Sequence, residues 1–289
     1  MSNHKRWIKL GFQICKLYIQ KKNNQTNLTT LSYNKISSVY DKKWIELDSC
    51  SMEMINRIKF PDGGKAIDLT CGTGYVTHLI NECFIGEVIG VDISDEMLKR
   101  ANEKYGDKCH FVCRDVLDFL EDQPSESVDI VTCAWGLGFL EPFQVIKEIS
   151  RILKPGGQLA IIDNSLFTVY EVVISGFSTI AEYPASVINV MNVRWLPTKG
   201  SLLRRMKLSG LQIVSSWSGK KTYYAKDEKD AIDFLLDTGT AAGYQFCFDP
   251  QYSNIIKQRF GVIFKKSYAT EEGLPITHRF IAAIAKKPK

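Results

Sequence analysis

The chain has 289 residues, of which 45% are hydrophobic and 24% are charged, and these are the proportions of an ordinary soluble globular protein. Its net charge of +5 sits largely at the two ends, which does not indicate a folded basic face for nucleic acid. The eight cysteines include no C-x-x-C pair and the four histidines are scattered, which argues against a zinc site. We expect reduced thiols, no bound metal and a cytoplasmic location.

The first 30 residues are predicted to lie outside the main domain. Residues 1–22 have the pattern of an amphipathic helix, whose polar stripe is formed by Lys5, Lys9, Gln13, Lys16 and Gln20. Residues 23–30 (NNQTNLTT) are polar and are interpreted as a linker, so the domain is expected to span 31–289. The helix could dock on the fold, dock on a second copy in a homodimer, or place residues 5–22 peripherally on an anionic membrane. The apolar run at 7–19 is too short to span a bilayer.

Strands and helices alternate from about residue 64. Strands are predicted at 65–69, 87–92, 110–113, 129–134 and 158–163. Helices are predicted at 75–84, from Ser94 onward, and at 143–153, where Lys154-Pro155-Gly156-Gly157 is a stop signal. Such alternation favours a parallel sheet with helices on both of its faces.

Residues 164–200 interrupt this rhythm with a long apolar and aromatic stretch, which we interpret as a helical lid inserted after the fifth strand. The alternation then resumes. Helices are predicted at 201–208, 227–237 and 252–265, and the sixth and last strands at 211–217 and 278–285. The expected fold is therefore α/β, with a Rossmann-like, seven-stranded, mostly parallel sheet.

A glycine loop follows the first strand, in the segment Ala66-Ile67-Asp68-Leu69-Thr70-Cys71-Gly72-Thr73-Gly74-Tyr75. Its glycines allow close backbone approach to a ligand, and the helix that follows offers unpaired N–H groups to an anion. The dinucleotide fingerprint G-x-G-x-x-G fails, because Thr77 occupies the third glycine position. The acid Asp68 would repel a pyrophosphate but attract a ligand with an ammonium group.

This segment resembles motif I of class I methyltransferases that use S-adenosylmethionine (SAM), with Thr70 in place of a more usual glycine. Segments 88–98, 111–116, 127–131 and 151–157 resemble the later motifs, and 33–41 resembles the N-terminal cap of ubiquinone- and menaquinone-type enzymes. In that family the acids at Asp92 and Asp115 would take the ribose hydroxyls and the adenine amino group. The resemblance implies cofactor contacts from Tyr33, Tyr40, Asp68, Thr70, Cys71, Gly72, Gly74, Asp92, Ile93, Met97, Asp115, Val116 and Cys133.

The resemblance further implies methyl transfer to a small acceptor, with S-adenosylhomocysteine as the product. The nucleobase-amine motif N/D-P-P-Y/F is absent after the fourth strand, where Trp135-Gly136-Leu137-Gly138-Phe139 stands instead, so a nucleic-acid acceptor is not favoured. Aromatic residues predict a lipophilic acceptor, contacted by Trp135, Phe139, Phe167, Tyr170 and Trp195. The catalytic residue stays unassigned, with His278, Tyr183 and Tyr223 as candidate bases.

Three alternatives remain open at this point. The chain could be a non-catalytic SAM-binding subunit, an RNA methyltransferase, or an NAD-dependent reductase, the last disfavoured by Thr77.

Overall fold

A computed structural model describes residues 3–21, 25–42, 45–191 and 193–289. The chain divides into two compact units, each built from three segments. Unit 1 comprises residues 1–43, 169–193 and 221–278, and unit 2 comprises 44–168, 194–220 and 279–289. This division differs from the expected one, because the predicted lid and the 221–278 segment join the N-terminal residues in a single unit.

Unit 2 is organised around a sheet of seven strands in the order β3-β2-β1-β4-β5-β7-β6. Strands β1 to β5 are parallel and β7 runs antiparallel to β5. The sheet confirms the seven-stranded, mostly parallel fold expected from the sequence. The strands are β1 (Lys65–Leu69), β2 (Glu87–Asp92), β3 (His110–Cys113), β4 (Val128–Ala134), β5 (Leu153–Asn164), β6 (Gln212–Ala225) and β7 (Leu274–Lys286).

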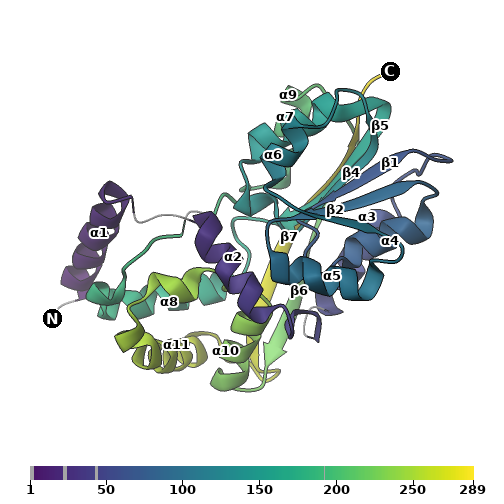
Figure 1. Ribbon diagram of the computed structural model, residues 1–289. Helices are drawn as coiled ribbons and strands as arrows, with labels where there is room; N and C mark the ends of the chain where they lie inside the picture. Colours follow the sequence, from purple (N-terminus) through teal and green to yellow (C-terminus); the bar gives the residue numbers. More distant parts are fainter. Residues whose placement is uncertain (1–2, 22–24, 43–44, 192) are drawn as a thin grey trace. The chain divides into compact units, whose positions relative to one another are not determined.

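Helices cover both faces of this sheet (Figure 1). On one face lie α6 (Val116–Glu121), α7 (Pro142–Ile152) and α9 (Lys199–Leu208), whose apolar side chains share a core with β1, β4 and β5. On the other face lie α3 (Ile45–Ile55), α4 (Tyr75–Cys83) and α5 (Asp95–Tyr105). Strand β5 is buried continuously from Gln158 to Asp163, as expected of a strand covered on both sides.

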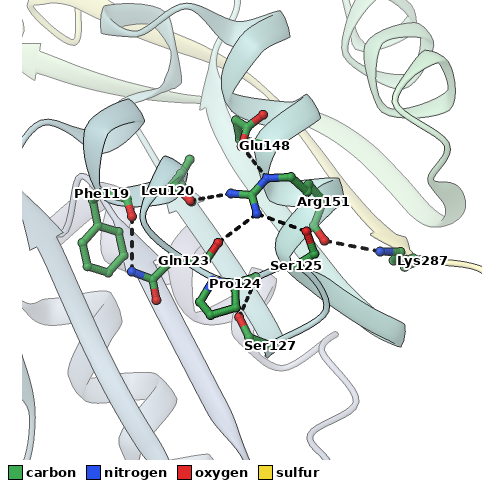
Figure 2. Close-up of polar contacts among 9 residues, drawn as sticks. All are labelled: Phe119, Leu120, Gln123, Pro124, Ser125, Ser127, Glu148, Arg151 and Lys287. Atoms are coloured by element: carbon green, nitrogen blue, oxygen red, sulfur yellow. Dashed lines mark hydrogen bonds and ion pairs between the residues drawn. The ribbon is translucent and has the colours of Figure 1, made fainter.

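Arg151 at the end of α7 secures the edge of the sheet where β4 begins. Its guanidinium donates to the carbonyls of Leu120 and Gln123, and it forms an ion pair with Glu148 at 2.7 Å (Figure 2). The Lys287 ammonium donates to the Arg151 carbonyl. The Arg151 side chain therefore connects α6, α7 and the turn before β4, and its carbonyl adds the end of the chain.

Unit 1 is mainly helical. Its elements are α1 (Asn3–Ile19), α2 (Gln25–Ile36), η1 (Tyr40–Lys42), α8 (Tyr170–Glu182), η3 (Pro184–Ser186), α10 (Glu228–Asp237), η4 (Tyr244–Cys247), η5 (Pro250–Tyr252) and α11 (Ser253–Tyr268). Glu182 of α8 accepts a bidentate pair from Arg259 of α11 at 2.6 and 2.7 Å. Strands β6 and β7 continue into this unit at residues 221–225 and 274–278.

Several predicted boundaries were wrong. Residues 25–30, interpreted as a linker, form the first half of α2, while 23–24 lie outside the described residues. Helix α7 ends at Ile152, as the stop signal at Lys154–Gly157 predicts, but β5 begins at Leu153 instead of residue 158, with a register shift opposite Val128 and Ile130. Both β6 and β7 are longer than predicted, because polar residues such as Lys220 and Thr277 weaken the apolar signal of a strand without breaking its pairing.

Candidate active site

A strained loop connects β1 to α4. Thr70, Gly72 and Gly74 have φ values of +56°, +55° and +85°, in the left-handed region. Glycine adopts this conformation freely, whereas Thr70 is β-branched and is strained there. The α4 helix begins after Gly74 without a side-chain cap and without an acid in its first turn. Its first N–H groups therefore form a site suited to an anion such as a carboxylate.

Asp92, the last residue of β2, braces this loop. One carboxylate oxygen accepts from the Gly72 amide at 2.9 Å and the other accepts from the Ser94 amide at 2.9 Å. Burial raises the pKa of Asp92, although the three backbone N–H donors around it act in the opposite direction. A carboxylate has about four lone-pair sites, so the three backbone donors leave capacity for a hydroxyl donor.

Asp68 lies beneath the loop. Only 1% of its surface is exposed, and its carboxylate accepts from the hydroxyls of Thr77 at 2.8 Å and Thr132 at 2.6 Å. Burial raises its pKa to about 7. Its side chain therefore ties α4 to β1 and β4 from below. Thr77, which excludes the dinucleotide fingerprint, is one of the two donors.

Asp115 follows β3 and caps α6, where its Oδ1 atom accepts from the amides of Leu117 and Asp118. Phe111 of β3 packs so closely against Gly74 and Gly90 that a Cβ at either glycine would lie 2.9 or 2.7 Å from its ring. The Gly90 position was not singled out by the sequence. The signal was a lone glycine inside a strand, which marks a close approach of neighbouring atoms.

The carboxyl end of β4 carries a second strained residue. Trp135 has a φ of +64°, and its indole N–H donates to the Ser51 hydroxyl of α3 at 2.9 Å. Gly136 then lies against Thr70, since a Cβ at Gly136 would be 2.3 Å from the Thr70 hydroxyl. The loops after β1 and β4 are thus in direct contact at the point where strand order reverses, which is where open α/β sheets bind ligands.

Asp163 of β5 was missed by the sequence analysis. Its carboxylate accepts from the amides of Gly138 and Asn164, each at 2.7 Å, and holds the turn η2 (Leu137–Phe139) after β4. Burial raises its pKa to about 7. The Trp195 ring lies against Gly138, where a Cβ would be 2.3 Å from it. The only sequence signal was an acid at the end of a buried strand.

The other predicted contact residues of unit 2 fall into an exposed group and a buried group. Ile93 is 41% exposed beside Asp92, and Phe167 is 61% exposed. Phe139 in η2 is half-buried. Three predicted cofactor contacts, Met97, Val116 and Cys133, are buried in the core next to the site. Cys71 is also buried, and its amide donates to the Val91 carbonyl.

The other predicted residues belong to unit 1. The rings of Tyr33 and Tyr40 meet edge to face at 5.9 Å, as do those of Tyr170 and Tyr268 at 6.0 Å. Tyr183 lies at the end of α8, with its ring 6.5 Å from that of Tyr252.

Two of the three candidate bases have environments that disfavour this role. Tyr223 donates to Asp230 at 2.9 Å, and burial together with that carboxylate raises its pKa to about 12. His278 is buried within β7, which lowers its pKa to about 4. Within the described residues no group of three metal-ligating side chains is found.

The sheet order, the antiparallel pairing of β7 with β5 and the glycine loop bonded to a strand-end acid together define a class I methyltransferase fold. Residues 67–161 match the family model described as a methyltransferase domain. This match identifies residues 67–161 as a methyltransferase domain, and the sheet around them has the fold of the class I SAM-dependent enzymes.

Individual similarities are partial. The chain is 34% identical over 147 residues to a demethylmenaquinone methyltransferase of Lactococcus lactis, covering 46% of this chain and 57% of that protein. It therefore spans less than two thirds of that relative. Its fold is similar to that of the YcgJ protein from Bacillus subtilis, with a TM-score of 0.56 at 17% identity, covering 83% and 99% of the two chains. Geranyl diphosphate C-methyltransferase from Streptomyces coelicolor gives 0.50 at 15% identity, covering 83% and 79%.

Proposed function

We propose that the chain transfers the methyl group of SAM to a small hydrophobic acceptor by in-line displacement and releases S-adenosylhomocysteine. The observation that carries this proposal is the Asp92 carboxylate, which accepts from the Gly72 amide of the glycine loop and retains capacity to accept from a ribose hydroxyl. SAM supplies an electrophilic sulfonium methyl, so the protein's task is chiefly to orient the acceptor and exclude water.

Different residues of unit 2 would bind different parts of SAM. The α4 N-terminus and the loop at Gly72–Gly74 would bind the carboxylate of the methionine moiety. Asp115 and the exposed Ile93 would contact the adenine. Asp68 would not contact SAM itself but would hold the glycine loop in position. Tyr33 and Tyr40 remain proposed cap residues on the strength of the family resemblance.

Calorimetric titration with SAM and S-adenosylhomocysteine tests the cofactor. Asp92→Asn should weaken both by at least about tenfold, because losing a charge-assisted acceptor costs about 1.5–3 kcal/mol. The matched control is Asp95→Asn, an exposed acid in the first turn of α5. Absence of binding to the unmodified chain would refute the proposal. Binding without turnover over a broad acceptor screen would favour a non-catalytic subunit.

A hydrophobic acceptor is supported by exposed apolar residues beside Trp195. Leu166 and Phe167 are 50% and 61% exposed, and the Leu166 amide donates to the carbonyl of Leu196. The similar proteins are named for demethylmenaquinone and geranyl diphosphate. Phenols, quinols and amines with lipophilic chains are therefore the first acceptors to screen. Salt-sensitive RNA binding would instead revive the RNA methyltransferase reading.

We also propose that α1 contacts an anionic membrane. Its buried face, with Leu10 and Leu17, packs in unit 1 on Ala181 and Val187. At about 100° per residue, Ile8, Phe12 and Ile19 point the opposite way, and they are 58%, 74% and 83% exposed.

The polar flank of this outward face fits an anionic surface. It is formed by the exposed lysines Lys5, Lys9 and Lys16, and α1 contains no acidic residue. A lysine flank beside an apolar face is the pattern of a helix that lies in a membrane interface. No described helix is long and apolar enough to cross a bilayer.

Sedimentation with vesicles of phosphatidylglycerol and phosphatidylcholine in equal parts tests this contact. Phe12→Ser should release the chain from these vesicles, while Leu31→Ser, which removes an exposed apolar residue of α2, should not. Equal binding of both variants would refute the proposal. A homodimer that only Phe12→Ser dissociates would assign the same face to a second copy.

A further inference from the structure

Unit 2 contains a cavity of about 440 Å³ that the methyl-transfer proposal does not use. Its walls come from the segment after β5, the start of α9, and neighbouring positions of β6 and β7. The lining residues are Ser165, Pro197, Thr198, Lys199, Ser218, Gly219, Lys220, Arg279, Phe280 and Ile281. The volume is in the range of small-molecule sites.

The charge of this cavity is of one sign. Lys199, Lys220 and Arg279 line it, and none of its lining residues is an aspartate or glutamate. The first turn of α9 adds the positive end of a helix dipole and carries no acid. Lys199 lies in the first turn of α9, where a cation is unfavourable. An anion in the cavity would offset this effect and would be attracted by the positive charges that line it.

The walls are fixed by hydrogen bonds within the unit. The Arg279 amide donates to the Thr168 hydroxyl at 3.1 Å, and the Arg279 carbonyl accepts from the Ser165 amide at 2.8 Å. Ser165 is also bridged to Leu196, two residues before Thr198. Thr198 and Ser201 form a reciprocal capping box that fixes the start of α9. The base of the Arg279 side chain and the helix end are thus held in place without a ligand.

From this arrangement we infer that the cavity binds a phosphate or diphosphate group. The hydroxyls of Ser165, Thr198 and Ser218 offer neutral donors, and the Arg279 guanidinium suits two phosphate oxygens at once. Lys199 and Lys220 add two point charges. A tetrahedral anion with several oxygens uses this set of donors better than a single carboxylate does.

The position of the cavity suggests the source of the phosphate. The carboxyl ends of β1, β4 and β5 share one edge of the sheet, and β5 is followed directly by Ser165. Two strand spacings separate β4 from β7, or about 10 Å. If the proposed function holds, the phosphate is the head group of the acceptor, whose reacting atom lies about this far from it.

The experiment titrates the full chain with inorganic diphosphate at low salt, and with SAM separately. The unmodified chain should bind diphosphate saturably, and Lys220→Gln and Arg279→Gln should each weaken binding by about tenfold, the loss expected from one charge-assisted hydrogen bond. Lys207→Gln removes the same charge from the last turn of α9, outside the cavity, and should change affinity less than about twofold. Lys220 is exposed, so its variant is expected to fold even if Arg279→Gln does not.

Two results would overturn the anion site: no saturable binding of diphosphate, or an equal loss in Lys207→Gln. Hexyl phosphate, hexanol and inorganic phosphate, compared in the presence of S-adenosylhomocysteine, test the source. Tighter binding of hexyl phosphate than of the other two supports an acceptor head group, whereas equal affinity for both phosphates overturns that assignment. Diphosphate binding without SAM binding would refute the proposed function while leaving the anion site intact.

Discussion

The contact between Thr70 and Gly136 allows a direct test of strain at the cofactor loop. Gly136 has a φ of −126°, outside the left-handed region that favours glycine, so its lack of a side chain is explained by its neighbour Thr70. A Cβ there would lie 2.3 Å from the Thr70 hydroxyl and 2.5 Å from the Thr70 Cβ. Gly136→Ala should therefore destabilise the fold by about 1–3 kcal/mol, as overpacking does.

Replacing Thr70 should remove that cost. Thr70→Gly relieves about 1–3 kcal/mol of backbone strain. It loses about 1 kcal/mol with the hydrogen bond to the Leu69 carbonyl, and about 0.4–1 kcal/mol because glycine gives the unfolded chain more freedom. The single variant should thus stay within about 1–2 kcal/mol of the unmodified chain.

The double variant separates contact from strain. In the Thr70→Gly background, Gly136→Ala should cost less than about 0.5 kcal/mol, giving a coupling energy of about 1–3 kcal/mol. Urea unfolding of the four proteins, followed by the combined fluorescence of the five tryptophans, measures this coupling. Additive effects of the two substitutions would refute the argument that Gly136 is required by Thr70.

Three further outcomes are expected. The folded-state pKa of Asp163, about 7, lies above its unfolded value of 3.8, so its stabilising contribution is full at low pH and is lost as pH rises toward 7. The stability of the unmodified chain relative to Asp163→Asn should fall by at most about 4 kcal/mol between pH 4 and 7 in urea titrations, and a pH-independent difference would contradict this. Gly90→Ala should cost about 1–3 kcal/mol, because its Cβ would lie 2.7 Å from Phe111, and Phe111→Leu should recover part of that loss in thermal unfolding. Arg151→Ala should lower the unfolding midpoint yet leave calorimetric SAM affinity unchanged, since its bonds lie where β4 begins; a large affinity loss would contradict that separation.

Local pattern was enough to predict the sheet and the acids that follow or end β2 and β3. Alternating apolar runs and glycine turns located β1 to β5, and Asp92 ends β2 as the sequence indicates. These features are encoded within short segments, because a strand, its turn and its helix cap are each set by neighbouring residues. The same holds for Asp115, which caps the helix that follows it.

Features that depend on distant partners could not be predicted. Asp163 supports a turn 25 residues away, and Trp135 bonds to Ser51 at a separation of 84 residues. Unit 1 is assembled from three separate segments, and its Glu182–Arg259 pair joins two of them across 77 residues. No local periodicity signals such pairings, since they are set by the tertiary fold.

The strain at the end of β1 and β4 is best understood as a property of a ligand site. Thr70 and Trp135 both have positive φ values on adjacent strands, at a cost of about 1–3 kcal/mol each. Such backbone conformations persist only where several surrounding contacts hold them in place. Asp68 ties β1 to β4 from below, and Ser51 holds the Trp135 ring. Under the proposed function, this strain fixes the loops after β1 and β4 at the sheet edge where the cofactor and the acceptor would bind.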